Sequence, residues 1–158
     1  MTTTVTNLWR PVGAYELRLI VRAGFTAYPP RLPGQPIFYP VCNEEYAVEI
    51  ARRWNLTDPN SGYSGFVTRF RVPEEVASAF PRRVVGARRH EELWVPAEQL
   101  ESFCGTFSEK IAVVRGWLGE RFPSVADWSG PLGELDSADL ARVVDLLAEA
   151  ELRGGPRT

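Results

Sequence analysis

Leu8-Trp9-Arg10-Pro11-Val12 and Pro36-Ile37-Phe38-Tyr39-Pro40-Val41 are the two stretches that decide the fold. Each is a short run of aromatic and β-branched residues bounded by glycine or proline, which is typical of a buried strand. The periodicity after each run predicts a helix, over residues 13–24 and 43–54. Asn43 is a good N-cap for the second helix, and Gly24 suits the left-handed position that ends the first. Two strand-to-helix units are therefore predicted.

Further strands and helices follow in separate blocks. Residues 65–72 alternate between large apolar side chains and arginines, which indicates a half-exposed strand. Similar reasoning predicts helices at 73–80 and 97–103, strands at 83–86, 91–96 and 110–114, and loops at 25–35, 55–64 and 124–133. Short strands in several blocks favour an α+β fold with a split mixed or antiparallel sheet and flanking helices, rather than a doubly wound parallel sheet.

The length of 158 residues suits one compact unit. We place the main domain at residues 8–118 and a C-terminal extension at 119–158. In this extension Asp136 caps an amphipathic helix that is predicted to run to residue 153 and to pack on the domain or on a partner. Residues 154–158 are predicted to form a loose tail.

The composition excludes several classes of protein. The net charge of −2 gives no global positive field, so bulk nucleic acid is not an expected partner. One histidine and no Cys-x-x-Cys spacing predict no metal site. Residues 1–7 carry neither a positive segment nor an apolar run, so we expect no signal peptide, and no run is long enough for a membrane span. A cytoplasmic location follows, with Cys42 and Cys104 reduced.

The candidate site residues are polar side chains in apolar strands, because no Walker, dinucleotide-binding or nucleophile-elbow motif is present. Arg10 can clamp a phosphate or a ribose in a bidentate manner; a structural ion pair or an outward orientation is the alternative. Tyr39 can stack on a planar heterocycle such as nicotinamide or adenine; a core tyrosine with a satisfied hydroxyl is the alternative.

The triplet His90-Glu91-Glu92 stands at the mouth of the predicted strand at 91–96. A carboxylate at this position can stabilise an oxocarbenium ion that develops on a ribose. His90 can donate a hydrogen bond to a phosphate or a ribose. The alternative for these residues is solvated loop charge.

Six stretches together resemble the small bacterial proteins commonly labelled "ADP-ribosylation/crystallin J1". They are LWRPVG at 8–13, FTAYPPRL at 25–32, QPIFYPV at 35–41, NEEYA at 43–47, GFVT at 65–68 and ELWVPA at 92–97, within a region of resemblance over residues 8–114. The order of elements also resembles the ADP-ribosyltransferase fold. The resemblance implies that Arg10 holds the ribose or phosphates of NAD, that Tyr39 packs near nicotinamide, and that Glu92, or Glu91, drives the chemistry.

The leading hypothesis is an ADP-ribosyltransferase-like protein that binds NAD or a related nucleotide and cleaves or transfers at the ribose–nicotinamide bond. Glu92 is the predicted catalytic residue, and Arg10, Tyr39, His90 and Arg31 are the predicted nucleotide-binding residues. We expect Arg10 and Tyr39 to face Glu92 across one cleft. The alternative is a non-catalytic interaction module with a degenerate nucleotide pocket, whose C-terminal helix contacts a protein partner or a second copy of the chain.

Overall fold

The computed structural model describes residues 4–155. Its strands are β1 (Val5–Val12), β2 (Ile37–Phe38), β3 (Ser64–Pro73), β4 (Arg82–Val84), β5 (Glu91–Leu93), β6 (Val95–Pro96), β7 (Ala112–Leu118) and β8 (Gly133–Glu134). Its α-helices are α1 (Ala14–Arg22), α2 (Glu44–Arg53), α3 (Glu74–Ala77), α4 (Leu100–Cys104) and α5 (Ser137–Glu149). Single turns of 3₁₀ helix lie at η1 (Asn55–Thr57), η2 (Pro59–Ser61), η3 (Ala97–Gln99) and η4 (Phe122–Ser124).

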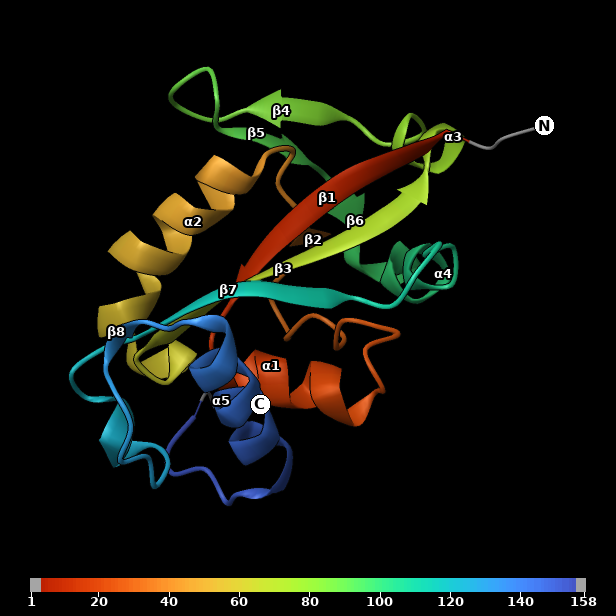
Figure 1. The fold of residues 1–158 in the computed structure, drawn as a ribbon. Helices are drawn as coiled ribbons and strands as arrows, with labels where there is room; N and C mark the ends of the chain where they lie inside the picture. Colours follow the sequence, from red (N-terminus) through yellow and green to blue (C-terminus); the bar gives the residue numbers. More distant parts are fainter. Residues whose placement is uncertain (1–3, 156–158) are drawn as a thin grey trace.

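An antiparallel sheet with strand order β1-β3-β7-β8 forms the centre of the fold (Figure 1). Val41 extends it beyond β1, because it exchanges two backbone hydrogen bonds with Trp9 and also pairs with Glu92. Segment 37–42 therefore lies between β1 and segment 91–96, which contains β5 and β6. Segments 37–42 and 91–96 run antiparallel to each other. β4 then pairs with β5 at the far edge. The mixed α+β class, with an antiparallel sheet and flanking helices, is confirmed.

The two faces of the sheet are covered by different helices. α1 and α5 pack together below the sheet in Figure 1, and α2 lies on the other side. The larger core contains Leu8, Phe66 and Phe70 of the sheet together with Leu17 of α1 and Leu147 of α5. The smaller core under α2 is formed by Val41, Tyr46, Ala47, Ala51, Val67 and Trp117. Neighbouring strand residues contribute to opposite cores because strand side chains alternate between faces.

Both predicted strand-to-helix units are present, with differences in extent. The Asn43 side chain caps α2 by accepting a hydrogen bond of 2.8 Å from the N–H of Tyr46, as the sequence predicts. β1 starts earlier than expected, at Val5, because its N-terminal half continues the ladder with β3. β2 covers only two of the six predicted residues. The prolines at 36 and 40 lack the N–H that a continuous ladder requires, so pairing there is intermittent.

Other boundaries differ from the sequence prediction for local reasons. The last predicted strand, residues 110–114, starts two residues later and runs further, as β7. The later start follows because the N–H of Ile111 is bonded to the carbonyl of Phe25 and not to β3. The helix predicted at 97–103 is divided into η3 and α4. The loop predicted at 124–133 ends in β8, which pairs with β7.

The C-terminal part of the chain contributes to the central core. α5 packs on α1, and its residues Val143 and Leu147 are fully buried. Asp136 caps this helix, as predicted, by accepting a hydrogen bond of 2.8 Å from the N–H of Asp139. The helix ends at Glu149, and Arg153 is held by the carbonyls of Pro123 and Ser124. Residues 156–158 of the predicted tail lie outside the described residues. No helix within residues 4–155 has the length and apolar character needed to cross a membrane.

Candidate functional site

Strand register decides which candidate side chains can meet. Trp9, Val41 and Glu92 are neighbours across three adjacent strand segments, so their side chains lie on the same face of the sheet, the face that α2 covers. Arg10 follows Trp9 in β1 and therefore points to the opposite face. The expected convergence of Arg10 and Glu92 on one cleft is thus incorrect, because the two residues differ by one step in the alternation.

Arg10 is occupied by an internal partner. Its guanidinium donates to both carboxylate oxygens of Glu16, at 2.6 Å from Nε and 2.9 Å from Nη2, and the exposed fractions of the two side chains are only 12% and 25%. Its Cζ atom also lies 4.8 Å from the centre of the Phe38 ring. Burial disfavours the charge, but Glu16 outweighs it and the pKa of Arg10 stays above its ordinary value. The structural ion pair considered as an alternative is the arrangement observed.

Glu92 is oriented by two aromatic donors. The hydroxyl of Tyr46 donates to Oε2 at 2.9 Å, and the indole N–H of Trp94 donates to Oε1 at 3.2 Å. Burial, followed by the hydrogen bond and charge of Glu92, raises the pKa of Tyr46 to about 12. A carboxylate accepts about four hydrogen bonds. Both oxygens of Glu92 are therefore fixed in position, with capacity left for a further donor.

Tyr39 continues this arrangement along the same face. Its ring meets that of Trp94 edge to face, with centroids 6.1 Å apart, and 37% of the residue is exposed. Arg31 lies beside it, with Cζ 5.7 Å from the Tyr39 centroid and Nε donating to the carbonyl of Ile37. Burial and the nearby charge of Arg10 lower the pKa of Arg31. We refer to Tyr39, Trp94, Glu92 and Tyr46 as the Glu92 row.

His90 adjoins this row at the end opposite Tyr39. Its ring stacks on Tyr46, with centroids 4.4 Å apart and an interplanar angle of 18°. Its Nε2 lies 3.0 Å from Oε2 of Glu49 on α2, and Arg89 binds the same carboxylate. These contacts, led by the hydrogen bond to His90, lower the pKa of Glu49. His90 therefore holds the loop between β4 and β5 against α2.

The structure thus brings together part of the predicted site. Tyr39, Glu92 and His90 are linked through Trp94 and Tyr46, and Arg31 flanks Tyr39. The sequence reasoning missed Trp94, although its place two residues after Glu92 in a strand predicts a shared face. It also missed Tyr46, which lies in the helix predicted over residues 43–54 and whose hydroxyl reaches Glu92.

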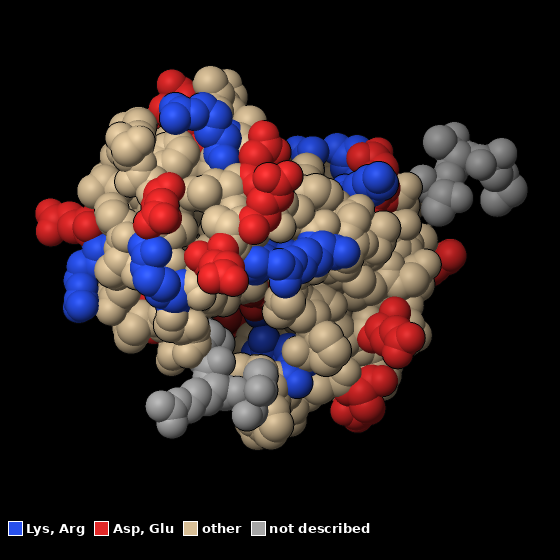
Figure 2. All heavy atoms as spheres, turned by 90° about the horizontal axis from the view of Figure 1, so that it is seen from below, with Lys and Arg blue, Asp and Glu red and all other residues tan. Residues whose placement is uncertain are grey.

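The Glu92 row runs from the exposed ring of Tyr39 to Tyr46, which is buried with 8% of the residue exposed. Among the surface cavities formed by residues 4–155, five have volumes of about 540–770 Å³, and none of these five is lined by Glu92, Tyr39 or Arg10. On the underside of the molecule, the side of α1 and α5 that Figure 2 shows, acidic and basic side chains are interspersed among uncharged residues. Within residues 4–155, no group of three or more His, Cys, Asp or Glu side chains is arranged to hold a metal ion.

The two cysteines are free thiols. Burial first, then the hydrogen bond with Glu91, raises the pKa of Cys42 to about 12, and burial also raises the pKa of Cys104. Both side chains are therefore protonated and weakly nucleophilic near neutral pH.

Comparisons of the chain with protein-family models, curated proteins and solved structures return no match.

Proposed function

We propose that the protein binds NAD or a related nucleotide at the Glu92 row, in the manner of an ADP-ribosyltransferase-like domain. The observation that carries this proposal is the Glu92 carboxylate, held by Tyr46 and Trp94 beside the exposed ring of Tyr39. A planar ring stacks on Tyr39 or Trp94, since aromatic faces bind flat heterocycles. The positive charge of nicotinamide in NAD complements the carboxylate.

Glu92 has the chemistry needed for cleavage of the ribose–nicotinamide bond. The bond between nicotinamide nitrogen and ribose C1′ breaks with its electron pair going to nitrogen, so neutral nicotinamide leaves and positive charge develops on the ribose. A fixed carboxylate stabilises that charge, and it accepts a hydrogen bond from a ribose hydroxyl. Water or an acceptor hydroxyl then attacks C1′ and loses its proton. Arg31 lies next to Tyr39, and we propose that it binds a phosphate of the nucleotide.

Glu92→Gln and Glu91→Gln form a matched pair of variants for testing this role. The two glutamates are adjacent, but Glu91 bonds to Arg82 and alternates to the other side of the strand. We expect the unmodified protein to bind NAD in calorimetry and to release nicotinamide. Release should fall by at least about 10²-fold in Glu92→Gln and be unchanged in Glu91→Gln. An absence of heat at millimolar NAD, with folded protein, would contradict the proposal.

A second candidate function is a non-catalytic interaction module with a degenerate nucleotide pocket. The observation that favours it is Arg10, which is bound to Glu16 on the other face of the sheet and is not directed to the Glu92 row. In this case NAD binds without release of nicotinamide, or does not bind. Calorimetry and a nicotinamide assay on the same preparation distinguish the two candidates.

A further inference from the structure

The outer edge of β7 is open over a short stretch. β8 covers this edge only at Trp117 and Leu118, where it forms two ladder pairs. Next to them the carbonyl of Gly116 accepts a hydrogen bond of 2.9 Å from the N–H of Leu135, and at the other end the N–H of Ile111 is bonded to the carbonyl of Phe25. Between these contacts, β3 is the one strand of the described residues 4–155 that pairs with residues 112–115.

The register determines which backbone groups point outward there. The backbone N–H and C=O of Trp9 are bonded to Val41, so they point away from β3. Arg69, which lies opposite Trp9, therefore points its backbone N–H and C=O toward β7, where it pairs with Ala112. In a trans peptide the N–H and C=O point in opposite directions, so the N–H of Val113 faces away from β3. Arg115 pairs with Val67, so its N–H points toward β3. The C=O of Val114 belongs to the same peptide group and therefore points outward. This edge therefore points one donor and one acceptor outward, and no strand among residues 4–155 pairs with them.

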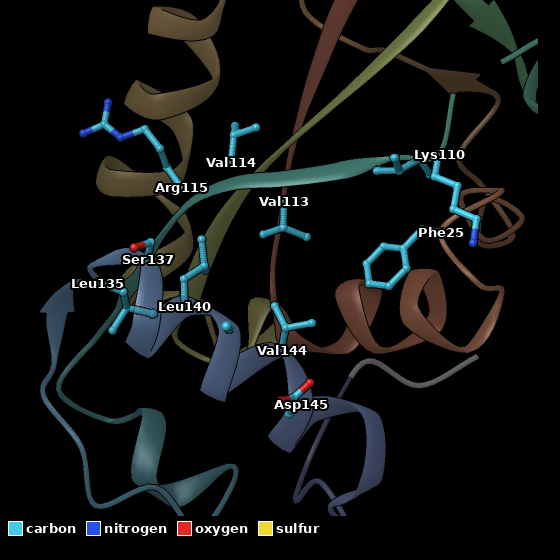
Figure 3. A pocket seen from close by; sticks show the side chains of 12 residues that line it. Phe25, Lys110, Val113, Val114, Arg115, Leu135, Ser137, Leu140, Val144 and Asp145 are labelled. Carbon is cyan, nitrogen blue, oxygen red and sulfur yellow. The ribbon is translucent and has the colours of Figure 1, made fainter. Parts of the chain in front are cut away.

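An apolar groove runs beside this open edge, between β7 and α5 (Figure 3). Its volume is about 540 Å³, which is within the range of clefts that bind ligands. Figure 3 shows Val113 pointing toward α5, with Leu140 and Val144 pointing back toward the strand and Phe25 closing one end. A strand added to β7 would place every second side chain in this groove, because strand side chains alternate.

The charge at the groove indicates what an added strand would carry. Lys110 lies at the end closed by Phe25 and has no ion-pair partner among residues 4–155. Arg115, at the other end, is already paired with Glu134 at 2.6 Å. Asp145 of α5 also lines the groove, so the charge there is mixed. An acidic residue in the added segment is therefore complementary only at the Lys110 end, where it meets the positive charge.

The open edge is short, which favours pairing with a single short strand rather than with the whole sheet of a second copy of the chain. The four residues 112–115 span about 13 Å of strand, and the chain at Phe25 and Leu135 bounds this stretch at both ends. A β-bulge at Val113 and Val114, opposite Thr68, adds local twist to the strand. A flat edge-to-edge contact between two whole sheets is therefore disfavoured.

We propose that the β7 edge binds an extended segment of another protein, which adds as a strand with apolar side chains at alternate positions in the β7–α5 groove and an acidic residue at Lys110. This inference is independent of the Glu92 row. It is tested by selecting a display library of random twelve-residue peptides on the full-length chain. We expect the enriched peptides to share alternate apolar residues next to one acidic residue, and the amide of Val113 to become protected from hydrogen exchange when a synthetic copy of such a peptide binds.

Two exposed alanines of α5 supply a matched pair of variants. Ala141 lines the groove and Ala138 does not. Ala141→Glu should weaken the selected peptide by at least about tenfold in fluorescence anisotropy, and Ala138→Glu by less than about twofold. Lack of enrichment, equal binding to Ala141→Glu, or peptides without the alternating pattern would each overturn the proposal. So would a dimer in sedimentation that Ala141→Glu abolishes, because the occupant would then be a second copy.

Discussion

Arg10 and Glu16 form a bidentate ion pair that joins β1 to the first turn of α1, on the face of the sheet opposite Glu92. The carbonyl of Arg10 is held as well, since it accepts a hydrogen bond of 2.7 Å from the hydroxyl of Thr68. The Tyr28 hydroxyl lies 2.7 Å from the Thr68 hydroxyl, and both of these residues are buried. This network gives Arg10 a structural role, which leads to the first prediction.

Glu16→Ala should lower the free energy of unfolding by about 2–4 kcal/mol, because it leaves the Arg10 charge buried and unpaired. Urea unfolding at pH 7 measures the loss. Glu109→Ala is the control, since Glu109 pairs with Arg71 at the surface with 60% of its side chain exposed, and its loss should stay below about 1 kcal/mol. Equal losses in the two variants would show that the Arg10–Glu16 pair contributes no more than a surface ion pair.

Tyr46 makes stability depend on pH at the alkaline end. Its pKa in the folded protein, about 12, is above the value of about 10 in an unfolded chain. A raised folded pKa gives stability that is complete below the unfolded pKa and is lost as the pH rises through the folded value. We therefore expect stability to fall between about pH 10 and pH 12, and this fall to be smaller in Tyr46→Phe. Thermal unfolding over this range is the measurement, and an identical slope in both proteins would contradict the assignment.

Glu49 makes stability depend on pH at the acid end, where stability is lost as the pH falls. The hydrogen bond from His90 and the charge of Arg89 lower its pKa in the folded protein. A lowered folded pKa gives stability that is present above the unfolded value of about 4.3 and is lost as the pH falls through the folded one. Glu49→Gln should therefore flatten the acid limb of the stability curve. The expected reporter of local release is faster hydrogen exchange at residues 85–90 in acid, and an unchanged acid limb in this variant would show that Glu49 does not tie this loop to α2.

Local sequence features were enough to predict α1, α2 and α5 and the N-caps of α2 and α5. Asn43 and Asp136 each have one short polar side chain that reaches a backbone N–H three residues on, so their role needs no long-range information. The α+β class followed from the separate short strands. The ends of β1 and β7 could not be predicted in the same way, because they depend on ladder partners far away in the sequence.

The site depends on register, which the sequence alone does not provide. Arg10 and Glu92 both stood out as charged residues in apolar strands, but whether they share a face depends on the pairing of Trp9 with Val41 and of Val41 with Glu92. A shift of one residue in either pairing would reverse the result. Glu92 and Trp94 belong to one segment, so their shared face was predictable. The contact of Tyr46 with Glu92 was not, because it joins α2 to a segment more than 40 residues away.

Gly65→Ala should destabilise the contact between β3 and α2 that supports the Glu92 row from behind. A Cβ atom on Gly65 would lie 2.6 Å from the backbone oxygen of Ala51 and 2.9 Å from its Cα, so the helix has to move away from the sheet. We expect a loss of about 1–3 kcal/mol in urea unfolding. Gly105→Ala is the control, because Gly105 has an ordinary φ of −63° and its added Cβ would lie 3.3 Å from the nearest atom. A loss in Gly65→Ala no larger than that of the control would mean that α2 shifts without cost, and that Tyr46 is not held rigidly against Glu92.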